Sequence, residues 1–378
     1  MFYHLLHIYK TKLIKALKEC YYWVIIKPNF FSWNPKILIV KNDAIGDYVL
    51  FNIFLFEIKQ SIKFKNYSID ILTNERLKPI VKELNNDLVN TIHTTNNDVF
   101  IYWGKFLHYF NILKKERYEY ILHPTYSANW ETHYFVKYIK AKYKIGFDGD
   151  LINISEEYKK KYNPIYTSLI KSHKRYIHEF ERNLEFFKIV LQKNITINKT
   201  YLPIIIEERS ENSNVILICP GAQHSFRIWG TKNLAELILS LQNWKSNLQF
   251  VVAVSPNEIQ LYESIKSQCN VPIIIHNITS ISKLCIQMQQ SKLVICNDSS
   301  AAHIAVANNV NSICISNGNN LGRFVPYPKW MNIKQTVILP PVFNHLNNDE
   351  KMKYYAGSDI DINSITVDSV LNSCKLFL

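Results

Sequence analysis

Short apolar runs recur along this chain, and stretches with helical periodicity separate one run from the next. The runs are rich in Ile, Val and Tyr, a composition typical of β-strands. Strands that alternate with helices predict βαβ units and parallel sheets, so we expect an α/β protein. The expected strands lie at residues 36–40, 67–73, 118–124, 214–220, 248–255, 271–276, 292–298 and 311–317.

The 378 residues of the chain exceed what one hydrophobic core usually serves, which predicts two domains. A polar stretch with the charged segment EERSENS divides the expected strands into two groups and is typical of a linker. Ligands of parallel α/β sheets bind at the carboxyl ends of the strands, which predicts a site in the cleft between the two halves. The expected units are a segment at 1–34, a first half at 35–195, a linker at 196–213 and a second half at 214–378.

The composition narrows the class of protein further. Hydrophobic residues make up 47% of the chain, which is ample material for globular cores. The seven cysteines show neither CxxC pairs nor the Cys/His spacing of metal ligands, and several of them lie inside apolar runs. This pattern is typical of buried thiols in a reducing cytoplasm, and it predicts no metal site.

The formal net charge of +13 indicates a polyanionic partner. Nucleic acid, a phosphorylated small molecule and an anionic membrane surface are the three candidates. No RNP-like or zinc-finger pattern accompanies the basic residues, which makes nucleic acid the weakest candidate, and we expect no nucleic acid partner.

Residues 1–34 mix aromatic and aliphatic side chains with lysines between Lys10 and Lys18. No apolar stretch in this segment approaches the roughly 20 residues of a spanning helix. No small-residue cleavage site follows its apolar run, which argues against a signal peptide. Two interpretations remain open: a basic amphipathic helix on the inner membrane face, or a helix packed on the body of the protein.

Three turns that follow expected strands contain residues that could take part in catalysis or ligand binding. The first is KNDAIGDYVL (41–50), where Gly46 permits close backbone approach and Asp47 stands at the start of a helix. An acid in this position is either a catalytic base at the edge of an active site or a helix cap. We expect Asp43 to be the structural residue of the same turn.

The second and third turns suit phosphate. CPGAQHSFRIWG (219–230) offers Gly221 and Arg227, whose guanidinium matches two phosphate oxygens, although a loop arginine is more often simply solvated. CNDSSAAHIAVA (296–307) places Asp298 or Ser299 as the cap of a helix whose first amides lack intrahelical partners. The alternative for this turn is an ordinary capped helix with a core histidine. Neither G-x-G-x-x-G nor G-x-x-x-x-G-K-[ST] occurs, which weakens dehydrogenase and NTPase interpretations.

These motifs carry a resemblance to a known family. ILIVKNDAIGDYVL (37–50) resembles the opening strand and small-x-GD turn of glycosyltransferase family 9, the bacterial heptosyltransferases. The stretch at 215–242, with a PGA-like turn, a basic residue and Trp, is similar to the opening of that family's second domain. The stretch at 293–317 is similar to its D-[ST]-G-x-x-H helix start. Weaker similarities lie at 118–148, 177–183 and 365–377.

The resemblance implies a GT-B fold, with two facing Rossmann-like domains: an N-terminal acceptor domain and a C-terminal nucleotide-sugar-binding domain. It implies metal-independent, inverting transfer of a heptose from ADP-heptose to the lipopolysaccharide inner core, at the cytoplasmic face of the inner membrane, without a cofactor. The acceptor would be an anionic glycolipid of the lipid A or core type. The matching residues are Asp47 as general base, Lys41 and Gly46 on the acceptor side, and Gly221, Arg227, Asp298, Ser299, Ser300 and His303 around the donor diphosphate.

Three departures from the family pattern keep alternatives open. Arg227 stands where many members have Lys, Ser300 replaces the usual Gly, and HPTYSAN replaces a more acidic strand-end segment. The alternatives are a related transferase with another sugar or acceptor, or a nucleotide-sugar-binding protein with weakened catalysis. A NAD-dependent oxidoreductase fits less well because the glycine fingerprint is missing.

Overall fold

The computed structural model describes residues 34–95, 116–204 and 213–378. The predicted N-terminal basic segment at 1–34 therefore lies almost entirely outside the described residues. Within the described ranges, no helix has both the length and the apolar character needed to cross a membrane.

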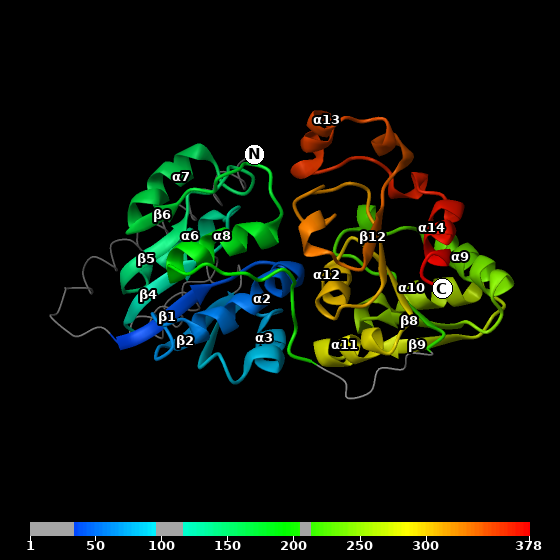
Figure 1. Ribbon diagram of the computed structural model, residues 1–378, viewed down its shortest axis with the longest axis horizontal. Helices are drawn as coiled ribbons and strands as arrows, with labels where there is room; N and C mark the ends of the chain where they lie inside the picture. Colours follow the sequence, from blue (N-terminus) through cyan, green and yellow to red (C-terminus); the bar gives the residue numbers. More distant parts are fainter. Residues whose placement is uncertain (1–33, 96–115, 205–212) are drawn as a thin grey trace, which may run out of the picture.

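The N-terminal half contains a parallel sheet of six strands in the order β3-β2-β1-β4-β5-β6 (Figure 1). Helices connect successive strands, as the alternating pattern predicted. The strands are β1 (Asn34–Val40), β2 (Ser68–Asn74), β3 (Thr91–Thr95), β4 (Tyr118–His123), β5 (Ala141–Phe147) and β6 (Ser168–Ile170). The described helices of this half are α2 (Ile45–Gln60), α3 (Lys78–Asn85), α6 (Trp130–Tyr138), α7 (Glu156–Tyr162) and α8 (Glu179–Leu191).

The C-terminal half repeats this arrangement with a second six-stranded parallel sheet in the order β12-β11-β10-β7-β8-β9. Its strands are β7 (Val215–Cys219), β8 (Gln249–Val254), β9 (Ile273–Asn277), β10 (Leu293–Asn297), β11 (Ser312–Ile315) and β12 (Gln335–Ile338). Its helices are α9 (Thr231–Trp244), α10 (Ile259–Ser267), α11 (Ile281–Gln289), α12 (Ser300–Ala307), α13 (Asn348–Met352) and α14 (Val367–Lys375).

All eight expected strands are present within one to two residues of their predicted bounds. The central strands could be predicted because both of their faces are buried, which makes their sequences apolar throughout. In β1, for example, Ile37, Leu38, Ile39 and Val40 are fully buried. Strands β3, β5, β6 and β12 were not predicted. The sequences of β3 (TIHTT) and β5 (AKYKIGF) contain too many polar residues to read as buried strands, and β3, β6 and β12 are edge or short strands.

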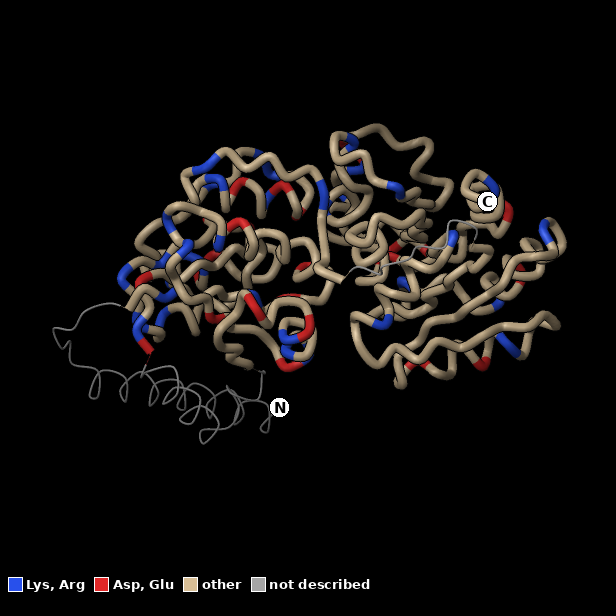
Figure 2. Tube along the Cα trace, turned by 60° about the horizontal axis from the view of Figure 1, so that its bottom comes forward, with Lys and Arg blue, Asp and Glu red and all other residues tan. Residues whose placement is uncertain are grey.

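The two halves meet where α2 of the first packs on α12 of the second, which Figure 1 shows near the centre of the molecule. One continuous apolar core includes Phe51 and Phe54 of α2 together with Ala302 and Ala305 of α12. The small side chains of α12 therefore allow a close helix contact between the halves. Figure 2 shows that the Lys and Arg positions of the described residues are spread over both halves.

Candidate functional site

The sequence-predicted motifs lie at corresponding places in the two sheets. In each sheet the strand order reverses at one point, between β1 and β4 in the first and between β7 and β10 in the second. Open parallel sheets bind ligands beyond the carboxyl ends of the strands at such reversal points. The turn with Asp47 follows β1, the turn with Arg227 follows β7, and the turn with Asp298 follows β10. All three motifs thus occupy positions where this fold places ligands.

The contact between α2 and α12 brings these turns toward each other. A Cβ atom built on Gly46 would lie only 2.8 Å from Cδ2 of His303, so glycine lets the histidine ring approach the start of α2. Nδ1 of His303 shares a 2.7 Å hydrogen bond with the Tyr327 hydroxyl. Burial lowers the pKa of His303 to about 3, which keeps the ring neutral. The imidazole of His303 is therefore engaged in the contact between the halves.

Lys41 and Asp43 form a buried ion pair next to Asp47. Nζ of Lys41 donates to Oδ2 of Asp43 at 2.7 Å, and Oγ1 of Thr125, beyond β4, donates to the same oxygen at 2.9 Å. Burial opposes both charges, but Lys41 and the hydrogen bonds hold the pKa of Asp43 below its ordinary value. Burial likewise disfavours the ammonium of Lys41, yet Asp43 and Asp47 outweigh it and raise its pKa. The predicted acceptor-side residue Lys41 thus has its charge matched within the protein.

Asp47 lies in the first turn of α2 and is half-buried. The helix cap is Ala44, which has no side-chain cap bond, and no described residue donates a hydrogen bond to the Asp47 carboxylate. Burial and the nearby charge of Asp43 raise the pKa of Asp47 to about 7, with Lys41 partly opposing the shift. A carboxyl group without partners that titrates near neutral pH is suited to accept a proton from a substrate.

On the opposite side, Ser299 is the cap of α12, where its hydroxyl accepts from the amide of Ala301 at 3.4 Å. Oδ2 of the buried Asp298 accepts from Oγ of Ser316 at 2.9 Å. Burial raises the pKa of Asp298, and the positive charge of Arg227 opposes that shift, which places the guanidinium in the field of Asp298. Nε of Arg227 is buried and has no hydrogen-bond partner in the part of the chain that the structure describes. The amides of Ala301 and Ala302 thus already bond to Ser299. The start of α12 still contributes the positive end of a helix dipole, and Arg227 contributes a cationic donor.

Two further residues hold the second and third turns in place. The Asn297 side chain donates to the Pro220 carbonyl at 2.6 Å and accepts from the Trp229 amide at 3.1 Å, so it joins β10 to the turn after β7. The fully buried indole of Trp229 donates to the Ile365 carbonyl at 3.0 Å. These bonds explain why the sequence has Asn and Trp beside the predicted phosphate residues.

Glu258 also lies at this edge of the second sheet, just beyond β8. A Cβ atom on Gly221 would lie 2.0 Å from Oε1 of Glu258, so glycine is required for the carboxylate to sit beside the turn. Oε2 of Glu258 accepts from the Ser255 hydroxyl at 2.6 Å, which fixes its orientation. Sequence analysis did not single out Glu258, because a lone Glu in a polar turn has no distinguishing pattern.

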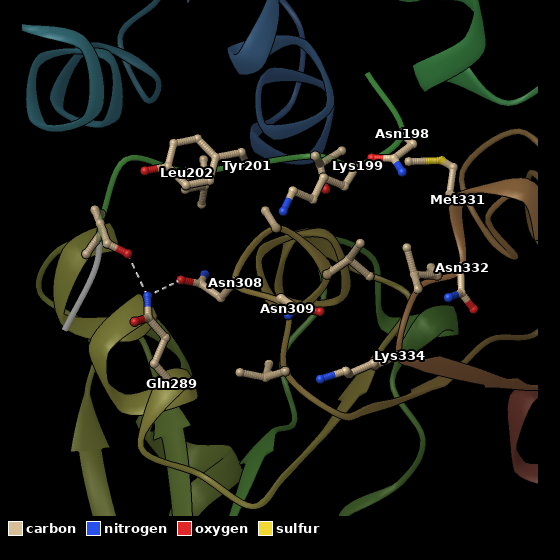
Figure 3. A pocket seen from close by; sticks show the side chains of 16 residues that line it. Asn198, Lys199, Tyr201, Leu202, Gln289, Asn308, Asn309, Met331, Asn332 and Lys334 are labelled. Atoms are coloured by element: carbon tan, nitrogen blue, oxygen red, sulfur yellow. Dashed lines mark hydrogen bonds between the residues drawn. The ribbon is translucent and has the colours of Figure 1, made fainter. Parts of the chain in front are cut away.

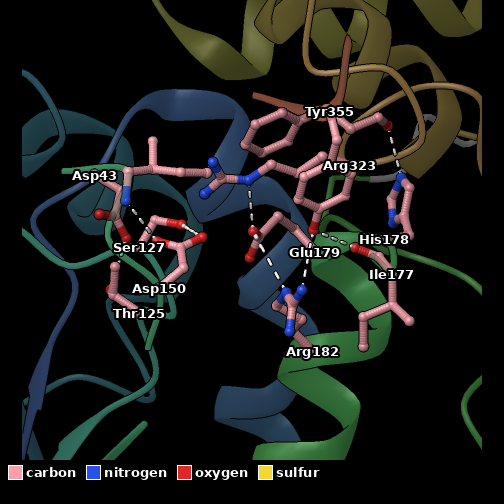
Figure 4. A network of polar contacts seen from close by, with 12 residues as sticks. Asp43, Thr125, Ser127, Asp150, Ile177, His178, Glu179, Arg182, Arg323 and Tyr355 are labelled. Carbon is pink, nitrogen blue, oxygen red and sulfur yellow. Dashed lines mark hydrogen bonds and ion pairs between the residues drawn. The ribbon is translucent and has the colours of Figure 1, made fainter. Parts of the chain in front are cut away.

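Glu179 and Arg323 complete the surroundings of Asp47 and were also missed. Nε of Arg323 donates to Oε1 of Glu179 at 2.8 Å, and the Glu179 amide donates to the Arg323 carbonyl at the same distance (Figure 4). Glu179 opens α8 in the first half, whereas Arg323 lies in the loop between β11 and β12 of the second. Glu179 belongs to the 177–183 stretch that carries a weaker similarity to the family, which is the one available signal.

A cavity of about 400 Å³ lies elsewhere, at the opposite end of α12 from Ser299 (Figure 3). Its lining comes from the chain before the second half, from the C-terminal end of α12 and from the starts of β11 and β12. The lining includes Lys199, Tyr201, Asn308, Asn309 and Lys334. This cavity is at the amino ends of the strands and is separate from the candidate site. Across the described ranges, no group of three or more His, Cys, Asp or Glu side chains is arranged to hold a metal ion.

The sequence profile of one family, glycosyltransferase family 9 (heptosyltransferase), matches residues 107–344, which is well over half of the chain. The chain belongs to glycosyltransferase family 9. The protein is therefore a family 9 glycosyltransferase. The matched residues include the turns with Arg227 and Asp298, whereas the turn with Asp47 lies before the match begins.

Solved structures support the fold. A family 9 glycosyl transferase from Veillonella parvula is 15% identical, with a TM-score of 0.69 over 90% of this chain and 96% of that one. E. coli heptosyltransferase WaaC with ADP is 14% identical, with a TM-score of 0.68 over 91% and 100% of the two chains. E. coli ADP-heptose lps heptosyltransferase II is 17% identical, with a TM-score of 0.64 over 90% and 98%. The predicted GT-B fold is confirmed. A search of curated proteins finds no match.

Proposed function

We propose that this enzyme transfers a heptose, with inversion, from ADP-heptose to the inner core of a lipopolysaccharide at the cytoplasmic face of the inner membrane. The observation that carries this proposal is Asp47, a half-buried carboxyl group that has no hydrogen-bond partner among the described residues and whose pKa is raised to about 7. Its counterpart is the cationic, amide-rich edge formed by Arg227 and the start of α12. A displacement reaction needs both kinds of group.

In the proposed reaction an acceptor hydroxyl attacks the anomeric carbon of the heptose from the side of Asp47. The new C–O bond forms while the bond between the anomeric carbon and the β-phosphate oxygen breaks. The hydroxyl proton moves to the Asp47 carboxylate, and the bonding electron pair leaves with ADP. Arg227 and the amides near Ser299 and Ser300 stabilise the charge of the departing diphosphate, so that no divalent metal is required.

The donor assignment draws on similar folds and on the geometry of the second sheet. The structures of similar fold include E. coli WaaC with ADP and with ADP-2-deoxy-2-fluoro heptose. Glu258 beyond β8 stands where parallel nucleotide-binding sheets place the acid that binds ribose hydroxyls. We assign Gly221 and Glu258 to the ribose side of the donor and Asp298 to the orientation of Ser316 and Arg227.

The test is a transfer assay with ADP-heptose and a lipid A-type core acceptor, read by mass spectrometry for the wild type and for Asp47→Asn. The wild-type rate is expected to rise with pH around an apparent pKa of about 7, because the carboxylate is the active form, and to persist in EDTA. Asp47→Asn is expected to lose at least about 10²-fold in rate. Equal rates for the two proteins would sink the base assignment. Donor binding without turnover on a panel of acceptors would instead favour the nucleotide-sugar-binding alternative.

A further inference from the structure

Arg323 brings a buried positive charge from the second half into the surroundings of Asp47. Its side chain is 10% exposed and comes from the loop between β11 and β12. The Nε–H group donates to Glu179, and the guanidinium lies 5.1 Å from the ring of its neighbour Phe324. In Figure 4 the two terminal nitrogens point away from Glu179, toward the side of the site where Asp43 and Asp150 lie.

The pair with Glu179 uses only part of this guanidinium. Arginine carries five N–H donors in a planar fork, and a carboxylate partner is usually bound through two parallel bonds. Here one donor is used, and none of the described residues accepts a hydrogen bond from either terminal nitrogen of Arg323. Four donors of this largely buried side chain are therefore left for a ligand.

The neighbouring cations are already engaged. Nζ of Lys41 pairs with Asp43 at 2.7 Å. The fully buried Arg182 donates to Ser172 at 2.8 Å and to the Tyr355 hydroxyl at 3.1 Å, and it stacks on a tyrosine ring. Lys41 and Arg323 are the cations that act on Asp47. Of these two, Arg323 has the guanidinium fork, and its terminal nitrogens have no acceptor among the described residues.

The position of Arg323 indicates which substrate the fork faces. The terminal nitrogens of Arg323 point toward Asp43, which belongs to the same turn as Asp47 (Figure 4), and Arg323 acts electrostatically on Asp47. On the donor side, Arg227 acts on Asp298. An anion held by Arg323 therefore lies beside the group that removes the proton from the acceptor, and it belongs to the acceptor rather than to the departing diphosphate.

We propose that the terminal nitrogens of Arg323 bind an oxyanion of the acceptor, a phosphate or a carboxylate close to the hydroxyl that is glycosylated. This inference rests on the proposed transfer reaction and names the residue that selects an anionic acceptor. It also gives the C-terminal half, which holds the donor, a direct contact with the acceptor. Binding of the acceptor anion then links the two halves, because Arg323 is tied to Glu179 at the start of α8.

Binding is tested without turnover, in the Asp47→Asn background, with deacylated lipopolysaccharide core oligosaccharide as the probe. Calorimetry compares the intact oligosaccharide with dephosphorylated and carboxyl-methylated forms, for D47N and for D47N with Arg323→Gln. R323Q is expected to weaken binding of the intact probe at least tenfold. For the modified probe that lacks the recognised anion, R323Q is expected to change binding by less than twofold. If this is the dephosphorylated probe, the ligand group is a phosphate; if it is the carboxyl-methylated probe, the ligand group is a carboxylate.

Two controls separate this role from a purely structural one. Glu179→Gln removes the same ion pair but leaves the Arg323 fork, so its effect is expected to be the same for charged and neutralised probes. Arg323→Lys keeps the charge without the fork and is expected to give an intermediate loss. Thermal unfolding checks that each variant is folded.

The outcomes also separate the inference from the proposed reaction. If R323Q weakens all probe forms equally, or if D47N binds none of them, the acceptor role of Arg323 is overturned. If binding depends on Arg323 as expected but wild-type enzyme transfers no heptose from ADP-heptose to these probes, the proposed reaction fails while the anion site stands.

Discussion

Asp47 should make the protein less stable than it could be, because its carboxylate is held in surroundings that disfavour charge. Burial and Asp43 raise its pKa from 3.8 to about 7. The folded state therefore binds the proton of Asp47 more tightly than the unfolded chain does. The stabilisation that this proton provides is fully present below pH 3.8 and is lost as the pH rises through 7. Asp47→Asn, which is nearly isosteric and cannot ionise, is expected to escape that loss.

The size of the effect follows from the shift. One pKa unit corresponds to about 1.4 kcal/mol, so a shift of about three units gives a ceiling of about 4 kcal/mol above pH 8. Part of the difference already exists at pH 5, because the unfolded carboxyl is ionised there. Between pH 5 and pH 8 the free energy of unfolding of D47N should therefore gain about 2 to 3 kcal/mol relative to wild type.

The assay is urea-induced unfolding of both proteins at several pH values between 5 and 9, followed by circular dichroism. The exposed Asp87 of the same half offers a matched control, since Asp87→Asn is expected to change stability by a similar small amount at every pH. A D47N-minus-wild-type difference that is flat from pH 5 to pH 8 would refute the reasoning. So would a difference that falls with pH, because it would mean that the folded state favours the Asp47 carboxylate.

Three further changes test the rest of the site. Arg227→Gln is expected to lower kcat by about 10²-fold and to leave the KM for the acceptor unchanged in steady-state assays. The kcat of Arg227→Lys should lie between those of wild type and Arg227→Gln. An effect on the acceptor KM alone would contradict the diphosphate role. Gly46→Ala places a methyl group against His303 and should lower the free energy of unfolding by about 1 to 3 kcal/mol, whereas Gly357→Ala, with 3.7 Å of room, should not. Ser299→Ala should cost about 1 kcal/mol and raise the KM for ADP-heptose; unchanged KM would show that the cap has no part in donor binding.

The sequence predicted the fold and the turns because both depend on local patterns. A central strand buried on both faces must be apolar throughout, and a turn at its carboxyl end must carry small or polar residues. Asp47, Arg227 and Asp298 were found in this way, from their positions next to β1, β7 and β10. The polar strand β3 was missed because neither of these constraints applies to an edge strand of five residues.

Residues that act through contacts distant in sequence left no such pattern. Thr125, Glu179 and Arg323 come from three different connections, and they meet around Asp47 and Asp43 only after the chain has folded. The raised pKa of Asp47 is equally invisible in the sequence, since it depends on burial and on a charge that the fold places nearby. The position of Asp47 could therefore be predicted from the sequence, but the residues that surround its carboxylate could not.

The two carboxylates of the first turn show how one short segment yields opposite roles. Asp43 accepts hydrogen bonds from Lys41 and Thr125 and remains ionised, with its pKa held below the ordinary range. That fixed negative charge is then one of the causes that raise the pKa of Asp47, to which no residue of the described ranges donates a hydrogen bond. A structural carboxylate and a proton acceptor are thus not alternatives in this turn. The structural role of Asp43 is part of what makes Asp47 basic enough to take a proton near neutral pH.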